Sequence, residues 1–342
     1  MGTATVQQLA SVSLDADNLW AYQMTHGDEG WDNYPTYLDA LVDVVLPGLA
    51  ERNLTITFFI VGQDAALEVN HAALRKIADA GHEIGNHSFR HQPWLHRYSL
   101  AEIHEELAAT EDALQLATGQ RPTGFRGPGY SLSPDVLRAL IDRGYRYDCS
   151  TLPTVIGPLA RRYYFRSAKL TAAQRAERAH LFGSATDGLR PLKPYLFRLG
   201  EDQLLEIPVT TMPLTRVPIH VSYVLYIAGV SPAAAFRYFA NALRLCRLRG
   251  VQPSLLLHPL DFLGADDVDS LRFFPGMTMT GATKRATVWR CLEEINRQFE
   301  VVTMRRHADA LLAKGGLPTR SAMTTAIAAS DDTPVPAAGA AT

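Results

Sequence analysis

The feature that most constrains the fold is a regular alternation of short apolar runs and amphipathic stretches along the chain. Runs such as residues 54–61 (LTITFFIV) predict buried strands, and the stretches between runs have the spacing of helices. This alternation is typical of βαβ units on a parallel sheet, so we predict an α/β fold, an irregular (β/α) barrel of seven or eight strands. The predicted strands are 10–15, 54–61, 82–87, 123–126, 145–149, 204–209, 253–258 and 299–304.

The chain length favours one domain, because soluble barrels commonly reach this size without division. We predict a single barrel domain over residues 1–318, followed by a disordered tail over 319–342 that is rich in Ala, Thr, Ser and Pro. The alternation fails over about 153–203, which we interpret as an inserted cap segment. Between residues 155 and 200 there are nine Lys or Arg and two acids, a balance of +7. Either a solvated helical face or a basic cap over an anionic substrate explains this charge.

Composition excludes several classes of function. A formal net charge of -2 argues against a nucleic-acid partner, which normally requires a basic domain. Three widely spaced cysteines form neither a disulfide framework nor a CxxC metal site. The first 20 residues contain no Lys or Arg, and no apolar run reaches the ~20 residues that span a bilayer. We therefore expect a cytoplasmic protein.

Polar residues recur where the predicted strands end. In a parallel barrel the carboxyl ends of all strands open onto one face, where barrel enzymes build their active sites. Residues more than 240 positions apart in the sequence would therefore converge. This set consists of Asp15, Asp17, His87, His91, Arg126, Asp148 and His258.

Two imidazoles and one carboxylate of this set suit a divalent metal. Asp17, His87 and His91 would bind zinc, with Co, Ni or Fe also compatible, and would leave open positions for water and substrate. A cation held there would activate water against an amide or ester. Asp15 is placed to take the proton of the water, and His258 to protonate the leaving nitrogen.

The loop after the fourth strand supplies further candidates. Gly129 and Tyr130 could present a backbone N–H to the developing oxyanion, and Arg126 suits a bidentate contact with Asp15 or Asp148. Among the aromatic residues near the metal motifs, Trp20 and Trp94 are candidates for stacking on a sugar, although core packing explains them equally well.

The segments SLDAD, NHSFRH, FRGPGY, YDCST and LLLHP resemble, in order, the five motifs of the polysaccharide deacetylases, also called the NodB-homology or carbohydrate esterase 4 family. The resemblance implies that Asp15 is the base, that Asp17, His87 and His91 bind the metal and that His258 is the acid. The Asp-Ala-Asp order, in place of adjacent aspartates, is similar to the intracellular branch of the family. The Tyr-Asp-Cys-Ser segment lacks the usual following Asp-Trp, which leaves Asp148 open as a partner for His258 or Arg126.

The leading hypothesis is metal-dependent removal of an N-acyl group, most simply acetyl, from an amino sugar. The basic segment and the apolar residues 217–230 suggest a nucleotide-linked sugar, or a lipid-linked sugar met through peripheral membrane contact. A cyclic amide or imide hydrolase, or a deformylase, is the alternative enzyme. An inactive carbohydrate-binding protein is the non-enzyme alternative, but such a protein needs no acid, base and metal set.

Overall fold

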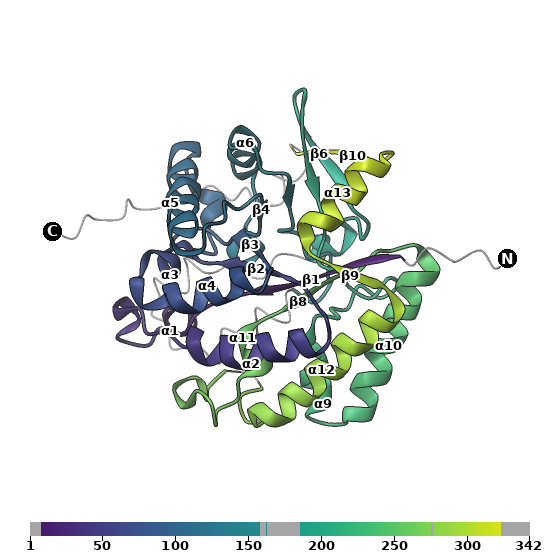
Figure 1. Ribbon diagram of the computed structural model, residues 1–342. Coiled ribbons are helices and arrows are strands. Elements are labelled where there is room, and N and C mark those ends of the chain that lie inside the picture. The colour runs from purple at the N-terminus through teal and green to yellow at the C-terminus, as the bar shows by residue number, and fades with distance from the viewer. Residues whose placement is uncertain (1–7, 158–161, 163–184, 275, 323–342) are drawn as a thin grey trace.

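A parallel sheet flanked by helices forms the centre of the molecule (Figure 1). The computed structural model describes residues 8–157, 162, 185–274 and 276–322. The strands are β1 (Leu9–Asp15), β2 (Thr57–Ile60), β3 (Glu83–Asn86), β4 (Gly124–Phe125), β5 (Tyr147–Asp148), β6 (Tyr195–Leu199), β7 (Asp202–Glu206), β8 (Ser254–Leu257), β9 (Glu300–Val302) and β10 (Thr319–Ser321).

The strand order is β10-β6-β7-β5-β4-β3-β2-β1-β8, and β9 also pairs with β1. All pairings are parallel except the hairpin of β6 and β7. The predicted α/β fold with a central parallel sheet is therefore confirmed, and all eight predicted strands are present. Within the described residues no pairing joins β8 to β10, so the barrel is irregular and does not close.

Two strands were not predicted. The first, β6, lies inside the predicted insertion and returns through a tight turn into β7. The second, β10, begins at Thr319, so the ordered domain extends into the segment that the sequence assigned to a disordered tail. Residues 323–342 of that tail lie outside the described residues, as do residues 158–161 and 163–184 of the basic segment.

Helices cover both sides of the sheet. In the view of Figure 1, α2 and α9–α12 lie below β1 and β8, while α5, α6 and α13 lie above. The helices are α1 (Leu19–His26), α2 (Leu38–Glu51), α3 (Gly62–Ala66), α4 (His71–Asp79), α5 (Leu100–Thr118), α6 (Pro134–Asp142), α9 (Val221–Ala228), α10 (Pro232–Arg249), α11 (Pro259–Phe262), α12 (Gly281–Gln298) and α13 (Met304–Lys314). None of the helices described is long and apolar enough to cross a membrane.

Local sequence signals account for several helix ends. Ser99 and Glu102 form a capping box at the start of α5, which satisfies backbone N–H groups that have no partner inside the helix. Helix α5 ends at Gly119 with a φ of 74° and α10 at Gly250 with a φ of 60°, a left-handed conformation that costs glycine little. The apolar segment 217–230 contains α9, which is half-buried against β8 and α10.

The largest core lies between β1, β2, β8 and the helices α2, α4 and α9–α12. Leu41 of α2 is fully buried in it. We expect Leu41→Ala to lower the free energy of unfolding by about 2–5 kcal/mol, since it removes apolar contacts and leaves a cavity. The matched control is Leu116→Ala on α5, whose side chain is 71% exposed and should change stability by less than about 0.5 kcal/mol. Urea unfolding measures both variants, and equal losses would contradict this assignment of the core.

Candidate active site

Seven predicted residues lie at or just after the carboxyl ends of the strands. Asp15 ends β1 and Asp148 ends β5, while His87, Arg126 and His258 directly follow β3, β4 and β8. Parallel pairing of β1 with β2 and β8, and of β2 through β5 in turn, brings these ends to one edge of the sheet. The remaining two, Asp17 and His91, lie on the loops that follow β1 and β3.

Asp17, His87 and His91 are close enough to share one metal ion. Their candidate ligand atoms all lie within 4.8 Å of one another. The Oδ1 atom of Asp17 is 3.0 Å from His91 Nε2 and 3.3 Å from His87 Nε2. This oxygen is buried and has no donor in hydrogen-bonding geometry among the described residues. Two imidazole nitrogens and one carboxylate oxygen that face one point fit a tetrahedral cation such as zinc.

His87 is oriented by a hydrogen bond on the far side of its ring. Its Nδ1 donates to the backbone carbonyl of Arg126 at 2.6 Å, which leaves the Nε2 lone pair directed toward Asp17. Such a second contact is typical of histidines that bind metals. Burial lowers the pKa of His87, but the charges of Asp15 and Asp17 raise it by more, so the net shift is upward. The negative field that produces this shift would also attract a divalent cation.

The pKa of Asp17 is shifted in the direction opposite to that of His87. Burial raises its pKa, but His91 and His87 together lower it by more, so that its pKa lies well below the usual range. Its carboxyl group therefore stays ionised at neutral pH. The backbone is fixed as well, because the hydroxyl of Tyr37 donates to the carbonyl of Asp17.

The loop between the two histidines has an uncommon backbone conformation. Ser88 and His91 have φ angles of 59° and 53°, in the left-handed region that residues other than glycine rarely adopt. The buried carboxylate of Glu106 on α5 holds this loop, since it accepts the backbone N–H groups of Phe89 and Arg90 at 2.9 Å each. Nothing in the local sequence marks Glu106 as part of the site, because its spacing fits an ordinary helical residue.

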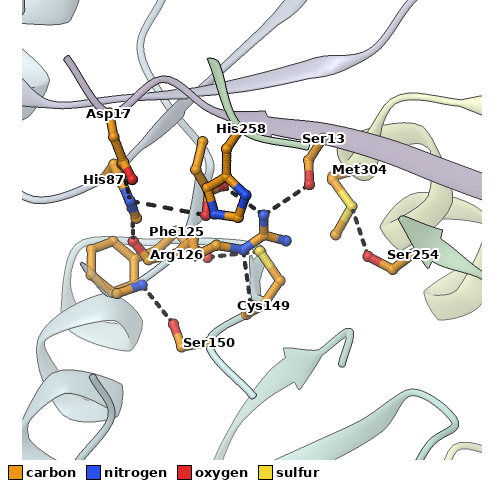
Figure 2. Close-up of polar contacts among 12 residues, drawn as sticks. Ser13, Asp17, His87, Phe125, Arg126, Cys149, Ser150, Ser254, His258 and Met304 are labelled. Carbon is orange, nitrogen blue, oxygen red and sulfur yellow. Dashed lines mark hydrogen bonds and ion pairs between the residues drawn. The ribbon is translucent and has the colours of Figure 1, made fainter. Parts of the chain in front are cut away.

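Arg126 is fully buried, and its guanidinium bonds to β1 and to the residue that directly follows β5 (Figure 2). One terminal nitrogen of its guanidinium donates to Asp15 Oδ1 at 2.6 Å and to Ser13 Oγ at 2.8 Å, and its Nε donates to the Cys149 carbonyl at 3.1 Å. The guanidinium also lies 4.6 Å from the ring centre of Phe59. Burial lowers the pKa of Arg126, but Asp15, Cys149 and Tyr130 together raise it by more, so the net shift is upward. Of the two acidic partners that the sequence left open, the structure places Asp15 against Arg126.

Asp148 has a different partner from those predicted. Its side chain lies next to Glu206 on the neighbouring strand β7 and accepts a hydrogen bond from Ser150 at 2.5 Å. Among the described contacts none joins it to Arg126 or His258, which corrects the prediction. Ser150 in turn accepts the backbone N–H of Gly127 at 2.8 Å (Figure 2), so the Asp148 pair supports the loop after β4.

Hydrogen bonds within the loop after β4 show which of its backbone N–H groups is free to donate to an oxyanion. The N–H of Tyr130 donates to the Gly127 carbonyl at 2.9 Å and is already used, which corrects its assignment as a donor. Gly129 is exposed, has a φ of 57° and shows no hydrogen bond from its N–H within the described part of the chain. The phenol of Tyr130 stays protonated, because burial and the nearby Asp15 raise its pKa.

The aromatic candidates divide into two cases. Trp20 is 1% exposed and donates its indole N–H to Asp64 at 2.8 Å, so it is a packing residue and cannot offer a face to a sugar. Burial raises the pKa of Asp64 to about 7. Trp94 is half-buried, and no contact between it and the metal cluster is found among the described side chains. Beside Trp20 lies a small cavity of about 70 Å³, lined by Trp20, Trp31, Tyr34, Gln63, Arg90 and Gln92.

Comparison with known proteins places this geometry in context. Residues 28–147 match the family model described as polysaccharide deacetylase. A peptidoglycan deacetylase of Helicobacter pylori is 27% identical over 156 residues, which are 46% of this chain and 48% of that protein. A peptidoglycan-N-acetylglucosamine deacetylase of Bacillus cereus is 33% identical over 84 residues, 25% of this chain and 30% of that protein. The chain spans less than half the length of these curated relatives.

Two solved structures share the fold over most of their length. A Mycobacterium smegmatis protein assigned by name to the polysaccharide deacetylases superposes with a TM-score of 0.59 at 19% identity, covering 93% of this chain and 95% of that one. The Puue allantoinase superposes with a TM-score of 0.56 at 17% identity, covering 91% and 92%. At these identities the likeness shows the fold alone.

The buried carboxyl pair of Asp148 and Glu206 generates a prediction about stability. Burial and the neighbouring Asp148 raise the pKa of Glu206 well above its usual range, so the folded protein holds Glu206 protonated. As pH rises above about 5, the unfolded carboxyl ionises first, and folding stability falls until the folded pKa is passed. Glu206→Gln keeps a hydrogen-bond donor and should make the free energy of unfolding less dependent on pH between about pH 5 and pH 8.

The control for this prediction is Glu201→Gln in the exposed turn before β7, which should leave the pH dependence unchanged. Urea unfolding at several pH values measures the slope for each variant. A slope in Glu206→Gln equal to that of the unaltered protein would show that Glu206 is ionised in the fold.

Proposed function

We propose that the chain is a member of the polysaccharide deacetylase family, and that it is a metal-dependent hydrolase that removes an N-acyl group, most simply acetyl, from an amino sugar. The observation that carries this proposal is the cluster of Asp17, His87 and His91 beside the buried pair of Asp15 and Arg126. A metal ligand set and a separate carboxylate at one edge of the sheet are the parts that hydrolysis of an amide requires.

Zinc is the metal that we propose, with cobalt, nickel or iron as chemically compatible substitutes. The cation would be held by Asp17 Oδ1 and by the Nε2 atoms of His87 and His91. When bound, it would polarise the acyl carbonyl and lower the pKa of water. The protein residues around it then determine where protons move.

Asp15 is the proposed proton acceptor. One of its oxygens, Oδ1, is held by Arg126, while Oδ2 lies 4.0 Å from His87 Nε2 and faces the cluster. This arrangement keeps the carboxylate oriented and leaves its second oxygen available for a proton. The exposed N–H of Gly129 is the proposed donor to the oxyanion. Such a donor is typically worth about 3–4 kcal/mol in the transition state.

His258 is the proposed proton donor to the departing amine. It follows β8, the strand on the opposite side of β1 from β2, and its ring is only half-buried. A general acid of this kind contributes about 10²- to 10⁴-fold to the rate. His220, the other imidazole beside it, has its pKa lowered to about 3 by burial, by His258 and by Arg126. His220 is therefore neutral and does not compete for this role.

Two observations support the proposed substrate class: the names of the similar proteins and the charge of residues 155–200. The names of the H. pylori and B. cereus relatives refer to peptidoglycan deacetylation, which supports an N-acetylated sugar here. The balance of +7 over residues 155–200 supports an anionic substrate such as a nucleotide- or lipid-linked sugar. The cytoplasmic location stays a prediction.

The metal site is tested by His87→Ala. We expect the unaltered protein to bind about one equivalent of zinc and to release amine from at least one member of a panel of N-acetylated sugars, sugar nucleotides and cyclic imides. The variant should lose both, because a site of two remaining ligands binds the metal weakly. Metal analysis and an amine-release assay measure the two quantities. The control is His104→Ala, which removes a surface histidine paired with Asp142 and should change neither.

The acid is tested by His258→Ala. This variant should retain zinc but lose about 10²- to 10⁴-fold in turnover. Unaltered turnover would remove His258 from the mechanism. Zinc binding without amine release from any N-acyl sugar, together with release from a cyclic imide, would select the alternative enzyme. A protein that neither binds metal nor turns over any substrate would select the inactive carbohydrate-binding protein.

A further inference from the structure

Ser222 lies next to the imidazole of His258, although the two residues are 36 positions apart. It belongs to the first turn of α9, which packs against β8, the strand that His258 follows. The Oγ atom of Ser222 is 3.2 Å from His258 Nδ1. The nitrogen that faces Ser222 is therefore engaged, and Nε2 is the ring nitrogen that remains for the reaction.

Asp261 is the third member of this cluster. It is 2% exposed, and its Oδ2 accepts the backbone N–H of His258 at 2.8 Å. Burial raises the pKa of Asp261 above its usual value. The charge of His258, hydrogen bonds from the His258 backbone and from Ser222, and the charge of Lys284 offset part of this shift and favour the ionised carboxylate. The ammonium of Lys284 donates to the carbonyls of Leu260 and Leu263 at 2.8 and 2.9 Å, which holds this turn in place.

We propose that Ser222 is a positioning residue that links His258 to Asp261 and fixes which ring nitrogen carries the proton. The role of His258 as the acid rests on the function proposed above. The tautomer of neutral His258 does not depend on that function. An ionised Asp261 can only accept hydrogen bonds, so the Ser222 hydroxyl donates to it. The oxygen of Ser222 then accepts from His258 Nδ1–H. Neutral His258 is consequently held with the proton on Nδ1, and Nε2 is the atom that gains and releases the transferred proton.

In this arrangement the Ser222 hydroxyl lies between the Asp261 carboxylate and the His258 imidazole, and among the described contacts no hydrogen bond joins the carboxylate directly to the ring. A hydroxyl is uncharged, so its bond to the ring is weaker than a bond from a carboxylate would be, but it is directional and selects one tautomer. His220, whose ring centre lies 6.1 Å from that of His258, is uncharged, because burial lowers its pKa. The orientation of His258 therefore depends on a hydroxyl from a helix that sequence analysis did not connect with the site.

The test is nitrogen NMR of the zinc-loaded full chain with labelled histidine, at alkaline pH where imidazoles are neutral. The His258 signals are assigned by their loss in His258→Ala. In the unaltered protein we expect His258 to carry its proton on Nδ1. In Ser222→Ala we expect the proton to shift toward Nε2, which is the tautomer that free imidazole favours, and in Ser222→Thr we expect the original form to be retained.

Ser231→Ala is the matched control, because Ser231 caps α10 and should leave His258 unchanged. Unchanged signals of the buried His307 in all variants show that folding is intact. A proton on Nε2 of His258 in the unaltered protein, or no change in Ser222→Ala, would overturn the proposal. On an active N-acyl substrate Ser222→Ala should lower kcat about tenfold with KM unchanged. Because the NMR result needs no turnover, failure of the proposed function and failure of this inference are distinguishable.

Discussion

The buried ion pair between Arg126 and Asp15 is the interaction on which the candidate site depends. Two charges removed from water cost several kcal/mol each unless additional hydrogen bonds compensate them. Here the guanidinium also bonds to Ser13 and to the Cys149 carbonyl, so one side chain just after β4 connects β1 with the residue that follows β5. The backbone carbonyl of the same residue fixes the ring of His87. Arg126 thus orients the proposed base with its side chain and a proposed metal ligand with its backbone.

Backbone conformation around the site is constrained by residues that are not part of it. Ser88, His91 and Tyr130 all have positive φ angles, which non-glycine residues adopt at a cost of order 1–3 kcal/mol. Glu106 offsets that cost in the histidine loop by accepting two backbone N–H groups, and Ser150 anchors the loop that contains Tyr130. The site is therefore held by carboxylates and hydroxyls on the adjacent elements, and loss of these groups would release the strained conformations.

The sequence alone predicted those parts of the fold and the site that depend on local patterns of residues. Hydrophobic periodicity predicted the eight strands, and parallel order placed their ends together, which brought Asp15, His87 and Arg126 to one edge. The sequence did not predict side-chain contacts that depend on which strands lie next to each other in the sheet. Asp148 pairs with Glu206 because β5 lies beside β7. The two residues are 58 positions apart, and the spacing of residues in the sequence does not predict that they are neighbours. Trp20 looked equally suited to sugar or core, and only its bond to the buried Asp64 decides for the core.

The Asp-Ala-Asp order explains how two nearby carboxylates take different roles. Along an extended backbone, side chains two apart project to the same face, so Asp15 and Asp17 both reach the site. Ala16, between them, is buried, and its N–H continues the pairing with β2 at 2.9 Å from the Phe59 carbonyl. Asp15 is charge-balanced by Arg126, whereas Asp17 faces two imidazoles and no arginine or lysine among the described contacts. The negative charge left at Asp17 is what a cation would neutralise, and the carboxylate already paired with Arg126 is the one that remains free to exchange a proton.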